Sequence, residues 1–292
     1  MTFPFLKKSS TTERIFLLAA LLIVGLIISV IIAVAITFLN GHVSELNILR
    51  ISQIGSQLFT FVLPPLLYAC LVKEKPMKSL SFCKTPLPYF IIGFVMMYAI
   101  TPLNNIFSVW NAGLELPESM AALEEMMKNL QESATQLTDK MLNISDISGL
   151  IINLFMIAGL AAFGEELLFR SLLQPFLIKI CKNAHLGIFL ASAIFSFIHF
   201  EFYGFLPRLV LGLLLGYMFF YSKSIWVPML MHFANNATAV VIYYLNNKGI
   251  TNIDVEGPTE TNIVYVLLSI VAMTVLFWLA IRINKKQNKE NA

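Results

Sequence analysis

The sequence predicts an all-α fold, a polytopic transmembrane helical bundle of about eight spans with both termini in the cytoplasm. Three observations predict this class. Hydrophobic residues make up 58% of the 292 residues and charged residues only 13%, roughly half the charged fraction of soluble domains. The apolar residues also form long blocks, and the basic residues favour alternate connecting segments. The formal net charge of +3 is too small to indicate nucleic-acid binding.

Eight apolar blocks are candidate spans, because a transmembrane helix needs about 20 mostly apolar residues. The first block follows Arg14 and is too long for a cleavable signal peptide, so we expect a retained anchor. The fifth and sixth form a short hairpin, and the sequence leaves open whether it crosses the bilayer fully. The expected spans are 15–39, 51–72, 88–110, 147–170, 186–203, 206–221, 225–245 and 262–281.

The distribution of Lys and Arg sets the expected topology. With a cytoplasmic N-terminus, fifteen basic residues fall on inner segments and five on outer segments, as the positive-inside rule predicts. The chain then divides into 1–110 (three transmembrane helices), 111–146 (an extracytoplasmic amphipathic helical segment), 147–245 (a catalytic membrane core) and 246–292 (a last transmembrane helix and a basic cytoplasmic tail).

The polar stretch 116–146 is predicted to be a helix with one apolar face, since apolar residues recur there at spacings of three and four from Met120 to Met141. It is expected to lie on the membrane or on the bundle, and a lid or substrate-docking element is the alternative. Within the spans, Pro102 predicts a kink. Gly212 and Gly216 predict close helix packing inside the bundle, and a dimer contact stays open.

The fourth span carries ionisable residues in an apolar helix, which usually pair or serve a function. Glu166 and Arg170 are four positions apart on one helix face and are predicted to form an ion pair. Glu165 is rotated by about 100° from Glu166, which places it poorly for that pair. We therefore expect Glu166–Arg170 to be structural and Glu165 to be free as a base.

The fifth and seventh spans add His199, His232 and Asn236. His232 and Asn236 are four apart and share a helix face, whereas Asn235 is expected to point away and pack against a neighbouring helix. Counting residues from the turns puts the two glutamates and His199 at similar depth, and His232 matches this depth if the hairpin of spans four and five projects about 10 Å into the cytoplasm. The sequence thus predicts one polar cluster in the cytoplasmic half of the bilayer, opening towards the cytoplasm.

These motifs, Glu-Glu-x-x-x-Arg, Phe-x-x-x-His and His-x-x-x-Asn, resemble those of the CPBP intramembrane proteases over about residues 145–245. That family includes the type II CAAX prenyl endopeptidases and the bacterial Abi proteins of bacteriocin processing and self-immunity. The resemblance implies an endopeptidase of a bacterial plasma membrane. It implies Glu165 as general base, His199 as its aid in holding the water, and His232 with Asn236 as donors to the oxyanion.

A metal site is a second reading, because Glu165, His199 and His232 match a three-ligand catalytic zinc set. The histidines lie on different spans and no His-Glu-x-x-His helix is present, so a metal-free mechanism is favoured. The expected partners are membrane lipids and a membrane-associated peptide or protein substrate, lipidated or bacteriocin-like. Two alternatives stay open: a non-catalytic immunity or binding protein, and a transporter with an intramembrane polar relay.

Overall fold

In the computed structural model, the described residues are 9–38, 44–254 and 261–290, and they contain helices and connecting loops without a strand. The all-α class is confirmed for this part of the chain. The helices are α2 (Thr11–Thr37), α3 (Glu45–Ser56), η1 (Gln57–Val62), α4 (Leu63–Val72), α5 (Pro76–Ser79), α6 (Leu87–Ala99), α7 (Thr101–Ala112), η2 (Glu118–Met120), α8 (Ala121–Leu142), α9 (Ile147–Asn153), η3 (Leu154–Leu160), α10 (Ala161–Glu166), η4 (Leu167–Leu173), α11 (Gln174–Cys181), α12 (Ala184–Phe197), η5 (Phe202–Gly204), α13 (Phe205–Ser222), α14 (Trp226–Asn247) and α15 (Ile263–Glu290).

Several of these helices are long and apolar enough to cross a membrane. Five described helices pass this test, and six do if α6 and α7, bent by 43° close to Pro102, form one span. The predicted kink is thus confirmed. The other two expected spans are α12, which is only 14 residues long, and α14, whose 22 residues include polar His232 and Asn236. The protein is a multi-pass membrane protein, and the count of eight stays a prediction.

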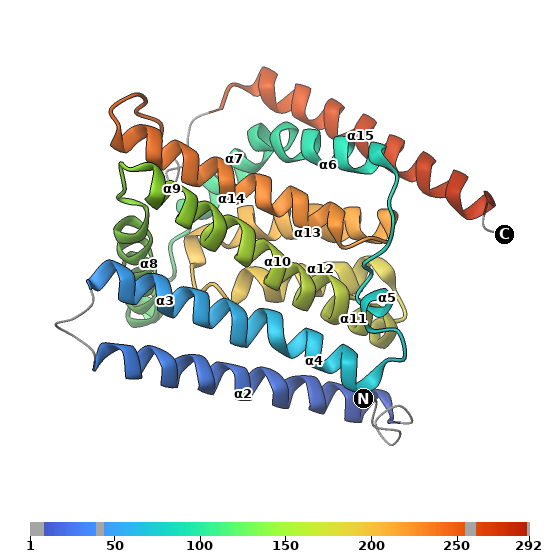
Figure 1. The fold of residues 1–292 in the computed structure, drawn as a ribbon. Coiled ribbons are helices and arrows are strands. Elements are labelled where there is room, and N and C mark those ends of the chain that lie inside the picture. Colours follow the sequence, from blue (N-terminus) through green and yellow to red (C-terminus); the bar gives the residue numbers. More distant parts are fainter. Residues whose placement is uncertain (1–8, 39–43, 255–260, 291–292) are drawn as a thin grey trace.

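The two ends of the described chain lie at the same end of the bundle. Figure 1 shows α2 beginning and α15 ending towards the right, near α5, whereas α8 lies across the opposite end. An even number of crossings has this geometry. Which end faces the cytoplasm stays a prediction from the basic residues.

Reporter fusions will test that orientation. Fusions after Lys84 and after Lys128 are expected to report opposite compartments, the first cytoplasmic and the second extracytoplasmic, because the positive-inside rule assigns them to opposite faces. Activity of a periplasmic-type phosphatase and fluorescence of a cytoplasmic reporter would be measured for both sites. The same compartment for both fusions would overturn the map.

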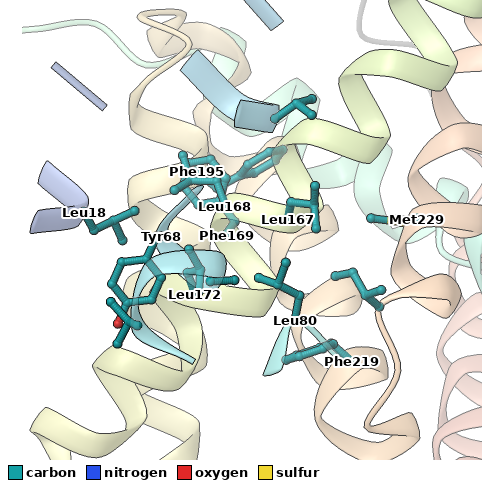
Figure 2. Close-up of a cluster of buried hydrophobic side chains, with 14 residues drawn as sticks. Leu18, Tyr68, Leu80, Leu167, Leu168, Phe169, Leu172, Phe195, Phe219 and Met229 are labelled. Atoms are coloured by element: carbon teal, nitrogen blue, oxygen red, sulfur yellow. The ribbon is translucent and has the colours of Figure 1, made fainter. Parts of the chain in front are cut away.

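The larger apolar core surrounds η4, the helical turn that follows Glu166. Figure 2 shows Leu167, Phe169 and Leu172 from this turn packed with Tyr68 of α4 and Phe195 of α12. The ring centroids of Phe169 and Phe195 are 5.2 Å apart in an edge-to-face arrangement. The helix that carries the glutamates is therefore fixed on several sides by apolar contacts.

The two glycines of α13 serve packing inside the bundle, as the sequence predicts. A Cβ on Gly212 would lie 3.0 Å from Cβ of Ser192, and one on Gly216 would lie 2.8 Å from Cγ2 of Ile188. Glycine thus lets α12 approach α13 closely. Whether the chain also forms dimers stays a prediction.

A closer approach joins α2 to η1. A Cβ on Gly25 would stand 1.8 Å from the carbonyl oxygen of Phe59, a backbone atom that cannot rotate away. Gly25→Ala is therefore expected to separate the two helices and to lower stability by about 1–3 kcal/mol, the usual range for overpacking. Gly55→Ala is the matched control, since its Cβ would meet only Cγ2 of Ile32 at 3.8 Å. Melting temperatures in detergent would be compared, and equal values would contradict the packing argument.

Candidate active site

The two glutamates lie in a continuous helix, 147–181, between two π-helical turns. The turn η3 precedes α10 and η4 follows it, while a third π-helical turn, η1, packs against α10. Such turns are rare and often mark functional sites, because they change the direction of side chains and free backbone groups. Gly164 permits this packing, since a Cβ there would lie 2.9 Å from Cβ of Phe61.

The predicted ion pair is present and fully buried. Nε of Arg170 lies 3.2 Å from Oε2 of Glu166, and the two side chains are 1% and 0% exposed. Arg170 also donates from Nη2 to the carbonyl of Gly212 at 3.3 Å, and its guanidinium lies 4.8 Å from the ring centroid of Phe195. This pair therefore ties η4 to α12 and α13.

Glu166 has a second partner that the sequence analysis did not identify. Nδ1 of His232 donates to Oε1 of Glu166 over 2.9 Å, and this bond fixes the imidazole. Nε2 of the same ring then lies 3.8 Å from Oε2 of Glu165. The two residues are 66 positions apart, and no spacing within one helix could have indicated the contact.

Gln57 is a further residue of the site that the sequence analysis missed. It lies in η1 and donates from Nε2 to Oε1 of Glu165 over 3.3 Å. Its side chain is 5% exposed. The available signal was a side-chain amide in the apolar second span, which the burial cost of a polar group makes unusual, although Gln53 in the same span gives the same signal. The amide holds one oxygen of Glu165 and leaves the other towards His232.

A cavity of about 520 Å³ brings four of the six predicted residues together: Glu165, His199, His232 and Asn236. Glu166 and Arg170 do not line it and lie behind it. His199 donates from Nδ1 to the carbonyl of Phe195 over 2.8 Å, so its Nε2 is available as an acceptor. Asn236 uses one hydrogen of Nδ2 on the carbonyl of Ile157, 3.1 Å away, in the π-helical turn η3.

Two expectations about this region are wrong. The cavity extends to α7, α8 and the α12–α13 turn, the end of the bundle opposite the basic loops, and not towards the predicted cytoplasmic face. The helix α12 ends at Phe197, and the turn that follows it lines the cavity together with residues of α7 and α8. Asn235 also lines the cavity and donates to Oδ1 of Asn236 over 3.1 Å, instead of packing against a neighbouring helix.

The predicted zinc ligands do not form a metal-binding group in the described part of the chain. No three His, Cys, Asp or Glu side chains there are placed to share an ion. As placed, Glu165, His199 and His232 do not fit a three-ligand zinc site.

Comparison with known proteins supports the resemblance. The model of the Rce1-like type II CAAX prenyl endopeptidase family matches residues 147–238, a range that contains all six predicted site residues. An uncharacterized protein of Bacillus subtilis (strain 168), YpbD, is 33% identical over 91 residues, which are 30% of this chain and 43% of YpbD. The match thus spans less than half of that relative. No solved structure matches the chain. Residues 147–238 form a domain of the Rce1-like type II CAAX prenyl endopeptidase family, of the CPBP class.

Proposed function

We propose that the protein is an intramembrane endopeptidase that hydrolyses a peptide bond of a membrane-associated peptide or protein with water activated by Glu165. The observation that carries this proposal is the common cavity. Glu165 of α10, His199 of the turn after α12, and His232 and Asn236 of α14 line one space inside the bundle. The family of the surrounding domain also suggests a peptidase.

In this proposal Glu165 is the general base. Its Oε1 is held by Gln57, and Oε2 is directed to the region between His232 and the cavity. A water that donates to Glu165 and to Nε2 of His199 loses its proton to Glu165 as its oxygen attacks the peptide carbonyl carbon. The same proton then passes from Glu165 to the departing amine as the C–N bond breaks.

His232 is the proposed donor to the oxyanion. The buried cluster of Glu165, Glu166 and Arg170 carries two carboxylates and one guanidinium, and a proton on both ring nitrogens of His232 balances this charge. Nδ1–H then donates to Glu166 and Nε2–H is free for the tetrahedral intermediate. Asn236 contributes its remaining amide hydrogen, because the other is on Ile157.

The proposed setting is a bacterial plasma membrane, and the proposed substrate is a membrane-associated peptide or protein that is lipidated or bacteriocin-like. Binding without turnover, as in an immunity protein, uses the same cavity and is the second candidate. Transport is disfavoured, since the motifs occur once and without a second, symmetry-related copy.

A substrate screen tests the proposal. Purified protein in detergent would be incubated with a library of internally quenched peptides and with membrane extract, beside Glu165→Ala. Cleavage products present with the parent protein and absent with the variant are the expected result. Binding of peptides without any cleavage would favour the immunity candidate.

Metal content is a separate prediction. Because the three candidate ligands do not converge, activity is expected to survive chelator treatment, and inductively coupled plasma mass spectrometry of the active, treated protein is expected to find less than one zinc per chain. Zinc that is lost in step with activity and restores it on readdition would contradict this expectation. Activity in this experiment is measured as the cleavage of one peptide from the library.

A further inference from the structure

The part of the cavity lined by α7 and α8 has an uncharged polar wall. We call polar wall the set Asn104, Asn105 and Ser108 of α7 with Gln131, Thr135 and Thr138 of α8. The three α8 residues share one helix face, at spacings of four and three. Leu123, Leu130 and Leu137, which belong to the predicted apolar face of this helix, are exposed. The helix therefore turns its polar side to the cavity.

The polar wall is connected to the active site by the α12–α13 turn. The side-chain oxygen of Gln131 accepts from the backbone N–H of Tyr203, 3.2 Å away. In the same turn Glu201 forms an ion pair with Nη2 of Arg208, and both residues line the cavity. His199, which also lines it, begins this turn. A peptide in the active site would thus pass Arg208 on its way to α8.

Two buried polar atoms of the lining have no hydrogen-bond partner among the described residues. They are Oδ1 of Asn104, an acceptor, and Nη1 of Arg208, a donor. Leaving buried polar atoms unsatisfied is unfavourable, and both atoms belong to residues that line the cavity, so water or a ligand with complementary groups supplies the partners there. An extended peptide offers both, an N–H for Asn104 and a carbonyl for Arg208.

We propose that Arg208, Asn104 and the polar wall bind the main chain of the substrate peptide on the α8 side of the scissile bond. This inference rests on the proposed function and names how that site recognises its substrate. Arg208 takes an internal carbonyl and not a terminal carboxylate. Glu201 already balances its charge, and a carboxylate would also be repelled by Glu165. The uncharged wall selects an uncharged peptide segment.

Peptide capture by the Glu165→Gln protein tests this, since the variant is not expected to consume its ligand. The probe is a mixture of eight-residue peptides of uncharged residues, acetylated and amidated, and a second mixture has the same sequences with free C-terminal carboxylates. Equilibrium dialysis with detection by mass spectrometry measures capture. The capped mixture is expected to be captured preferentially. Arg208→Met and Asn104→Leu, each added to Glu165→Gln, are expected to reduce its capture about tenfold.

Two further variants keep the test independent of folding. Arg282→Met removes a basic residue of α15 outside the cavity and is expected to capture peptides like the parent. Glu201→Gln combined with Arg208→Met removes the paired charges together, so no uncompensated charge stays behind, and it should still lose capture. Undiminished capture by this double variant, or preference for free carboxylates, would overturn the inference. Cleavage retained by Glu165→Gln would instead refute the proposed function.

Discussion

Glu165→Gln is expected to lower the turnover number by about 100- to 10,000-fold, the contribution typical of a general base. Glutamine keeps the size of the side chain and a carbonyl oxygen for the Gln57 amide, but it cannot take the proton of the attacking water. The melting temperature should stay near that of the parent, because Glu165 is not part of the Glu166–Arg170 ion pair.

The measurement is the rate of cleavage of one library peptide by matched, purified variants. Asn236→Ala is the control within the cavity. Its amide has one hydrogen on Ile157, so losing it removes only part of one oxyanion donor and should leave measurable turnover. The cleavage rate of His232→Ala is expected to lie between those of Glu165→Gln and Asn236→Ala, since the change removes an oxyanion donor and leaves Glu166 without its histidine partner. A Glu165→Gln enzyme as active as Asn236→Ala would refute the role of base.

The residues of the site could be predicted because their signals are local. Charged residues are so unfavourable in an apolar span that Glu165, Glu166 and Arg170 are visible without any structure. The spacing of four between Glu166 and Arg170 sets their contact by helix geometry alone. The same holds for the small residues of α13, whose side of the helix was expected to pack closely.

What the sequence could not predict depends on contacts between helices. The Glu166–His232 bond joins α10 to α14, and the Gln57–Glu165 bond joins η1 to α10. Neither contact has a fixed spacing along the chain. The direction of the cavity was also missed, because it depends on how α7, α8 and the α12–α13 turn pack together, and these contacts have no fixed spacing along the chain. On α8, the spacing predicted one apolar face, but it could not indicate that the opposite, polar face lines the cavity.

Arg170→Met is expected to have the largest effect on stability, a loss of about 3–5 kcal/mol, which is typical when one partner of a buried ion pair is removed. Glu166 is 0% exposed and would keep a charge that only His232 could balance. The bond from Nη2 of Arg170 to the carbonyl of Gly212 would also be lost. Low yield and a reduced melting temperature in detergent are the expected result.

The double variant Glu166→Gln with Arg170→Met distinguishes the effect of the ion pair on stability from its effect on cleavage activity. Removing both charges leaves no uncompensated ion, so most of the stability lost by Arg170→Met should return, as replacement of whole buried ion pairs by neutral groups generally allows. Activity should not return, because a glutamine at position 166 offers Nδ1 of His232 a neutral acceptor, which stabilises a protonated imidazole less than a carboxylate does. Melting temperature and cleavage rate would be measured for parent, single and double variants. If the double variant is no more stable than Arg170→Met, the ion pair is not what holds η4 to its neighbours. If the double variant has full activity, Glu166 does not position His232 for catalysis.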